Sequence, residues 1–86
     1  MSEVRTSVRG LTSAEILRAI GSGARTGNIV DALRPRLAAS KSYAMHRTAL
    51  LRRLKWMEAN GLIHRTRYSA DNDYHWRVGA KPHGEG

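Results

Sequence analysis

The stretch from Thr48 to Val78 constrains the fold more than any other part of this chain of 86 residues. It opens with apolar residues at helical spacing and reaches Asn60-Gly61, a pair typical of a helix that ends in a left-handed residue. A strand pattern follows at once, then a polar turn and a second strand pattern. The sequence therefore predicts a helix joined directly to a two-stranded hairpin.

The helix of this stretch has one apolar side and one basic side. The apolar side is formed by Leu50, Leu54 and Met57, with Leu51 at its margin. Arg52 and Lys55 fall on the opposite side. The pattern leaves three starts open for this helix, because Ser40 or Ser42 can act as the N-cap, or the helix can begin only near His46.

The hairpin pattern has charged and aromatic faces. A first strand over residues 62–68 would place Arg65 and Arg67 on one face, because side chains alternate along a strand. On the second strand Trp76 and Val78 alternate with polar residues, and the turn between the strands spans residues 69–73. A lone hairpin is marginally stable in water, so we expect Trp76 and Val78 to pack on the preceding helix.

Two shorter helices precede this stretch. Thr12 and Glu15 form a capping box that starts the first helix, and the glycines of residues 21–23 end it. A second helix is expected over residues 26–33, since Pro35 disfavours the helical state of the residue before it. Together with the hairpin, these helices predict an α+β fold.

Length and composition predict one soluble domain. A chain of this length supports one modest core. We expect a flexible N-terminal arm over residues 1–10, the domain over residues 11–78 and a disordered tail over residues 79–86. The sequence has no cysteine and no apolar run of the ~20 residues that span a membrane, so a cytoplasmic, nucleoid-associated location is expected.

The positive charge is concentrated. The net charge is +8, and residues 41–69 contain only Glu58 as an acid. The basic residues of that segment are Lys41, Arg47, Arg52, Arg53, Lys55, Arg65 and Arg67. Basic charge gathered on one segment is typical of proteins that bind polyanions, although small basic proteins also carry solvated charge without a partner.

Residues 54–65, Leu-Lys-Trp-Met-Glu-Ala-Asn-Gly-Leu-Ile-His-Arg, resemble a known family segment. They are similar to the L-x-x-L-E-x-x-G-L-I-x-R pattern of winged-helix regulators of the MarR, ArsR and PadR types, with Met57 at the second Leu position. The resemblance extends more loosely over residues 12–78. It implies a winged helix-turn-helix, with three helices, a two-stranded β-wing and, as an option, a short extra strand after the first helix.

The resemblance also implies a function. A small transcriptional regulator of this kind would bind double-stranded DNA, with the third helix in the major groove and the wing on the backbone or minor groove. The candidates for reading bases are Ser42, Tyr43, His46, Arg47, Thr48 and Arg52. The candidates for backbone contacts are Lys41, Arg53, Lys55, Arg65, Arg67, Arg77, Arg34 and Arg36. Arg47 lies near the edge of the apolar side, so a structural role stays open for it.

Met45 and Trp56 share a stripe of the same helix. Two interpretations stay open for Trp56, namely burial against the second helix or wing, and a contact between two copies of the chain that would include Met45. Homodimers commonly bind paired half-sites on DNA, and this is the arrangement we favour.

Catalysis and cofactors are not expected. The four histidines are dispersed, with no carboxylate at ligand spacing, and the seven acids form no pair suited to general acid–base chemistry. The sequence therefore predicts no enzyme, no metal and no cofactor. Two alternatives to DNA remain, which are an adaptor whose basic surface holds an acidic protein and a binder of structured RNA.

Overall fold

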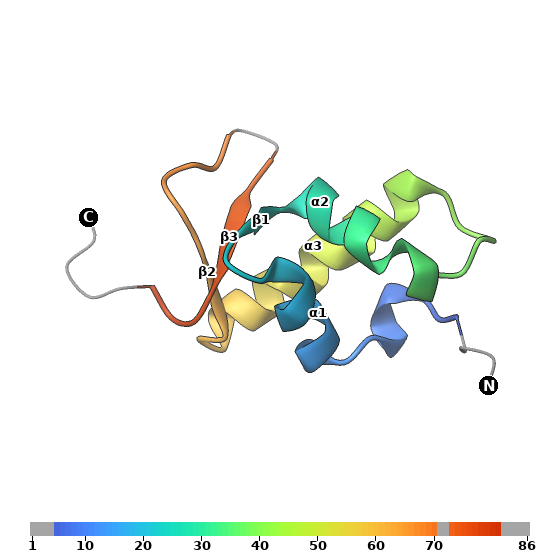
Figure 1. Cartoon of the computed structure of the whole chain (residues 1–86), viewed down its shortest axis with the longest axis horizontal. Helices are drawn as coiled ribbons and strands as arrows, with labels where there is room; N and C mark the ends of the chain where they lie inside the picture. Colours follow the sequence, from blue (N-terminus) through green and yellow to red (C-terminus); the bar gives the residue numbers. More distant parts are fainter. Residues whose placement is uncertain (1–4, 71–72, 82–86) are drawn as a thin grey trace.

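The computed structural model describes residues 5–70 and 73–81 as a small α+β domain (Figure 1). Its elements follow the order η1 (Val8–Gly10), α1 (Ser13–Ile20), β1 (Ala24–Arg25), α2 (Thr26–Leu33), η2 (Arg34–Arg36), α3 (Tyr43–Ala59), β2 (Ile63–Arg65) and β3 (His75–Val78). The strands form one antiparallel sheet in the order β1-β3-β2. The short extra strand after the first helix is thus present, and the predicted α+β class is confirmed.

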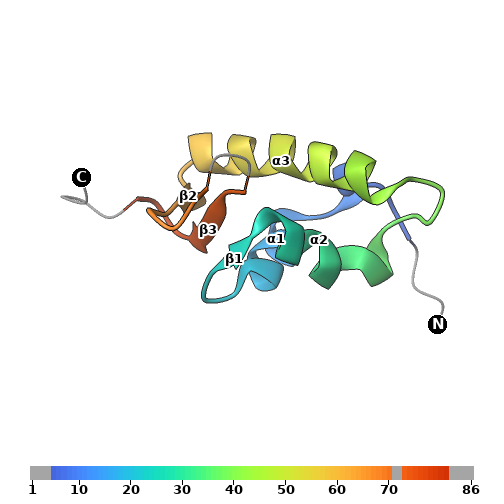
Figure 2. The same ribbon diagram turned by 90° about the horizontal axis from the view of Figure 1, so that it is seen from above.

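The long helix α3 forms one side of the molecule. Figure 2 shows α1, α2 and β1 on the other side, with β2 and β3 near the C-terminal end of α3. The core between these layers contains Val8, Leu11, Ile16, Ile20, Ile29, Val30, Leu33, Leu37, Leu50, Leu54, Met57, Ile63 and Trp76. The apolar side predicted for α3 therefore faces the core, and its opposite side is left for solvent.

The first two helices begin and end where their sequence signals lie. The hydroxyl of Thr12 accepts from the amide of Glu15, and the Glu15 carboxylate accepts from the amide of Thr12, so both halves of the capping box form. Gly21 ends α1 with a φ of 56°. The helix α2 gives way to the 3-10 turn η2 at Pro35, as the restriction before proline predicts.

Local bonds fix both ends of α3. Ser42 is its N-cap, and the Ser42 hydroxyl accepts from the amide of Met45 at 3.3 Å, which decides between the three starts that the sequence left open. At the other end Gly61 has a φ of 75°. The amide of Leu62 donates to the carbonyl of Met57 at 3.0 Å, which is the six-residue bond of a Schellman motif. The chain therefore reverses directly into β2.

The hairpin differs from its prediction in two respects. The strand β2 ends at Arg65 instead of continuing to residue 68, because the hydroxyl of Thr66 accepts from the amide of Tyr68 and turns the chain. Trp76 is fully buried, as predicted, but the Val78 side chain is 47% exposed. Val78 is the last residue of β3 and lies at the end of the sheet, away from the packed layer.

The residues before α1 belong to the domain, so the prediction of a flexible arm is wrong for residues 6–10. The amide of Thr6 donates to the carbonyl of Arg36 at 2.8 Å, and the amide of Ala38 donates to the carbonyl of Thr6 at 3.0 Å. Val8 is only 2% exposed. The single apolar Val8 among polar neighbours gave no periodicity, and for that reason the sequence did not predict the contact.

Gly79, the first residue of the tail predicted over residues 79–86, is bonded to the domain. The amide of Gly79 donates to the carbonyl of Leu62 at 2.7 Å, and the carbonyl of Gly79 lies 2.9 Å from the Nδ1 atom of His64. Gly79 therefore closes the end of the sheet. Residues 82–86 of the predicted tail and residues 1–4 of the predicted arm lie outside the described residues.

Candidate functional site

Each acid in the described residues is ion-paired with an arginine. The four pairs are Arg25–Asp73 at 3.5 Å, Arg34–Asp31 at 3.3 Å, Arg36–Glu15 at 2.8 Å and Arg65–Glu58 at 3.0 Å. These carboxylates are therefore directed at particular arginines within the domain. The net positive charge is therefore carried by the lysines and arginines outside these four pairs.

Arg36 has a structural role within the domain, and its contact with a DNA backbone stays a prediction. Its guanidinium bonds both carboxylate oxygens of Glu15, which also accepts from the amide of Thr12. These hydrogen bonds, the one from Arg36 first, lower the pKa of the Glu15 carboxyl to about 2. The pair thus joins η2 to the start of α1.

Arg65 is likewise engaged within the domain. Its guanidinium makes two bonds of 3.0 Å to the carboxylate of Glu58 and lies 4.7 Å from the ring centre of Tyr74. The hydrogen bonds to Glu58 raise the pKa of the Arg65 guanidinium. This arrangement fixes β2 against the last turns of α3, and the predicted phosphate contact of Arg65 stays a prediction.

Arg53 and Arg34 also bond inside the domain. The guanidinium of Arg53 donates to the carbonyl of Leu11 at 3.0 Å and to the hydroxyl of Ser13 at 3.1 Å. Arg53 therefore ties α3 to the start of α1, and its predicted phosphate contact stays a prediction. Arg34 pairs with Asp31 and lies 5.8 Å from the ring centre of Tyr43, while its side chain stays largely exposed.

Four of the six predicted base-reading residues lie off the exposed side of α3 or are used structurally. His46 is 7% exposed, and its Nε2 atom lies 3.0 Å from the carbonyl oxygen of Ala38. The Ser42 hydroxyl is occupied as the helix cap. The Tyr43 ring lies on the α2 side, under Arg34. Arg47 is half-buried and is engaged in an interaction of its own.

The other two predicted base readers lie on the exposed side of α3. This side, called the α3 surface below, consists of Met45, Thr48, Arg52, Lys55 and Trp56, all exposed and aligned by helical spacing. Neither Arg52 nor Lys55 is ion-paired with an acid of the described residues. Lys41 is exposed just before the helix. Lys41, Thr48 and Arg52 line one groove, and Lys55 lies about one turn after Arg52 along α3.

Met45 and Trp56 are 55% and 54% exposed. The alternative in which Trp56 was buried against α2 or the hairpin is therefore wrong. The Arg53 guanidinium lies 5.8 Å from the ring centre of Trp56, at the margin of the α3 surface. The α3 surface is thus both basic and apolar.

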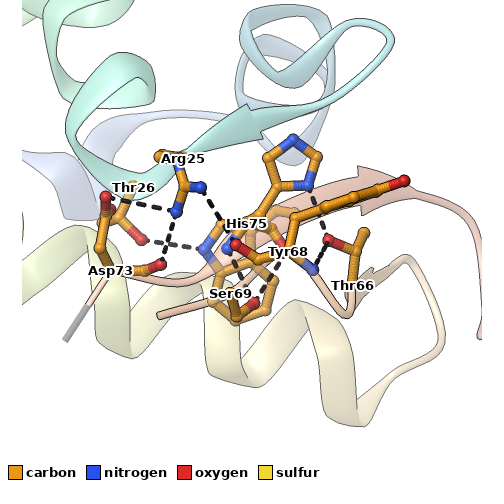
Figure 3. Close-up of polar contacts among 8 residues, drawn as sticks. Arg25, Thr26, Thr66, Tyr68, Ser69, Asp73 and His75 are labelled. Atoms are coloured by element: carbon orange, nitrogen blue, oxygen red, sulfur yellow. Dashed lines mark hydrogen bonds and ion pairs between the residues drawn. The ribbon is translucent and has the colours of Figure 1, made fainter. Parts of the chain in front are cut away.

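A network of polar contacts holds the hairpin loop (Figure 3). Arg25, the last residue of β1, donates to the carbonyls of Asp73 and Tyr68, at 3.1 Å each. The hydroxyl of Ser69 accepts from the amide of His75 at 2.9 Å. Arg25 therefore bonds both ends of the loop, a role that no sequence pattern predicted, since β1 has only two residues.

The hairpin presents its own basic groove. Arg67 and Arg77 line a groove of about 480 Å³ that also includes His64 and Tyr68. Tyr68 is exposed, and the Arg67 guanidinium lies 5.5 Å from its ring centre. The prediction that Arg65 and Arg67 share one strand face is wrong, because β2 ends at Arg65.

Within residues 5–70 and 73–81, no group of three or more His, Cys, Asp or Glu residues is arranged to hold a metal ion. Among the helices of the same residues, none is long and apolar enough to cross a membrane. Comparisons with protein-family models, with curated proteins and with solved structures gave no match to this chain.

Proposed function

We propose that this chain is a winged-helix domain that binds double-stranded DNA as a small, non-catalytic transcriptional regulator. In this proposal α3 enters the major groove and the β2–β3 hairpin is the wing. The observation that carries it is the α3 surface, where Arg52 and Lys55 are exposed while each described acid is paired elsewhere. A solvent-facing helix side with uncompensated cations suits the negative potential of a DNA groove.

The arrangement of elements supports the same proposal. Two short helices precede a longer one, which passes through the turn at Gly61 into the hairpin. The strand β1 pairs with β3 and so ties the hairpin to the start of α2. The hairpin therefore has a fixed position relative to α3, which a protein needs if helix and wing are to contact one DNA duplex together.

The exposed residues have different roles in this proposal. Arg52 reads a base edge, with guanine as its preferred partner, because a guanidinium can donate two parallel bonds to guanine O6 and N7. Thr48 lies one turn earlier and contacts a neighbouring base. The backbone contacts come from Lys41, Lys55, Arg67 and Arg77.

Fluorescence anisotropy of a labelled random-sequence duplex, measured across a salt series, tests the proposal. We expect micromolar binding that weakens steeply with salt. After a preferred site has been selected from a random library, Arg52→Ala should reduce the preference for that site by ~1–3 kcal/mol. Arg18→Ala is the matched control, since Arg18 is an exposed arginine of α1, outside the α3 surface.

The proposal fails if the wild-type protein does not bind the duplex at low salt. Tighter binding to a structured RNA than to the DNA duplex would favour the RNA alternative. If neither nucleic acid binds, the basic surface is better explained by an acidic protein partner, and retention on an immobilised acidic polypeptide would test that role.

A second candidate function is self-association through α3. The exposed Met45 and Trp56 favour it, because tryptophan is enriched among the residues that dominate protein contacts. Sedimentation velocity of the wild type and of Trp56→Ala, with and without DNA, tests this candidate. A dimer that is lost in Trp56→Ala supports it, and a monomer under both conditions in the wild type rejects it.

A further inference from the structure

A groove separates η1 from the first half of α3, which lie side by side (Figure 2). Its volume is about 410 Å³. Three cations line it, and they come from three segments: Arg9 from η1, Lys41 from the connection before α3, and Arg52 from α3 itself. The described lining contains no carboxylate. The groove therefore combines positive charge from both sides with a partly apolar floor.

The backbone that carries Arg9 is held in place. Val8 is buried beside α3, and Thr6 bonds to the chain on both sides of Leu37. Gly10 is packed so closely that a Cβ atom there would collide with the side chain of Thr6. Arg9 is thus an exposed cation on a fixed segment, which reduces the entropy lost when it binds an anion.

The place of the groove relative to the hairpin suggests its ligand. Figure 1 shows the hairpin at one end of the molecule, whose long axis is about 45 Å, and η1 beyond the middle toward the other end, which is formed by the connection before α3. The helix α3 between them has 17 residues and is about 25 Å long. If α3 lies in a major groove, cations at both of its ends can reach phosphates that flank this groove.

We propose that the groove between η1 and α3 binds a phosphate of the DNA backbone, held by Arg9 and Lys41. Arg52 adds positive potential at the margin while its guanidinium contacts a base. The proposal rests on the DNA-binding function proposed above. It joins Arg9 to the backbone contact already proposed for Lys41, and so assigns a role to Arg9, which lies in the predicted arm.

The test measures the salt dependence of duplex binding for Arg9→Ala. The slope of log K against log salt is negative, and one lost phosphate contact lowers its magnitude by about 0.9. We expect that change, together with equal weakening on random and on selected sequences, whereas Arg52→Ala should mainly reduce sequence preference. Arg9→Lys keeps the charge and should restore most of the slope, and Arg18→Ala should leave it unchanged.

Lys41→Ala provides an independent variant on the other side of the groove, and it should lower the magnitude of the slope by a similar amount. Circular dichroism and a thermal melt show whether each variant is folded. If the wild type binds DNA with a steep slope and both variants keep that slope, the phosphate site is rejected and the DNA-binding function stands. If the wild type itself shows no salt-dependent binding, both proposals are rejected.

Discussion

The indole nitrogen of Trp76 donates a hydrogen bond of 2.9 Å to the hydroxyl of Thr26. Both side chains are fully buried, and they join the middle of β3 to the first residue of α2. Among the described residues, no buried side-chain nitrogen or oxygen lacks a hydrogen-bond partner. The Thr26–Trp76 bond is therefore the way in which this core accommodates the polar end of its largest side chain.

Replacing Thr26 by valine should destabilise the domain. Valine keeps the shape of threonine but leaves the indole N–H of Trp76 buried without an acceptor, which costs about 1–3 kcal/mol. Urea unfolding at neutral pH measures the difference. Thr26→Ser keeps the hydroxyl and should be clearly more stable than Thr26→Val, and equal stability of the two variants would contradict this account.

Gly61→Ala should lower the free energy of unfolding by about 1–2 kcal/mol. Gly61 has a φ of 75°, which an L-residue with a Cβ atom adopts at that cost. The added Cβ atom would meet nothing within 4 Å, so the loss would come from the backbone alone. Gly61→Asn is the comparison variant, because asparagine tolerates the left-handed region better, and its loss in a thermal or urea melt should be smaller.

The Glu15–Arg36 pair should make stability depend on pH in the acid range. The pKa of the Glu15 carboxyl is about 2 in the folded chain, against an ordinary value of 4.5. Because the folded pKa is the lower one, the ionised carboxylate stabilises the fold fully above about pH 5. This contribution declines between about pH 4.5 and pH 2.

Urea unfolding of the wild type and of Glu15→Gln at several pH values checks this dependence. Glutamine can still accept a bond from the amide of Thr12, but it lacks the charge and one of the two oxygens that accept from Arg36. The wild type should be the more stable protein at pH 7, and the difference should shrink as the pH approaches 2. A difference that stays constant from pH 7 to pH 2 would show that the charge of Glu15 does not contribute.

Arg25→Ala should loosen the hairpin loop more than the core. The substitution removes the donors to the carbonyls of Asp73 and Tyr68. Hydrogen exchange should become faster at the amides of Ala70 and Asp73, which bond each other across the loop, and should stay slow at Leu54 in the core. Arg25→Lys should resemble Arg25→Ala, because one ammonium group does not reproduce the planar fork that contacts both carbonyls. Unchanged loop exchange would contradict the role of Arg25.

The features that the sequence predicted correctly depend on local signals. The capping box at Thr12, the restriction before Pro35 and the left-handed turn at Gly61 each involve residues close in the chain. The apolar side of α3 followed from helical periodicity. Such signals are legible in a single sequence because the interactions that cause them span only a few residues.

The partners of the arginines were not predictable in the same way. Arg53 bonds to the chain 42 residues before it, and Arg36 bonds to Glu15, 21 residues away. A basic residue on a helix is compatible with a phosphate, a carboxylate or a carbonyl, and only the tertiary fold selects among them. For this reason the predicted backbone contacts included Arg36, Arg53 and Arg65, whose guanidinium groups stabilise the domain itself.

The two tryptophans of this chain occupy opposite environments. Trp76 is enclosed in the core, and Trp56 is on the α3 surface, where solvent reaches its ring. Their fluorescence should therefore separate, with blue-shifted emission from Trp76 and red-shifted, easily quenched emission from Trp56. The native chain thus contains two optical reporters, one for the integrity of the core and one for whatever covers the α3 surface.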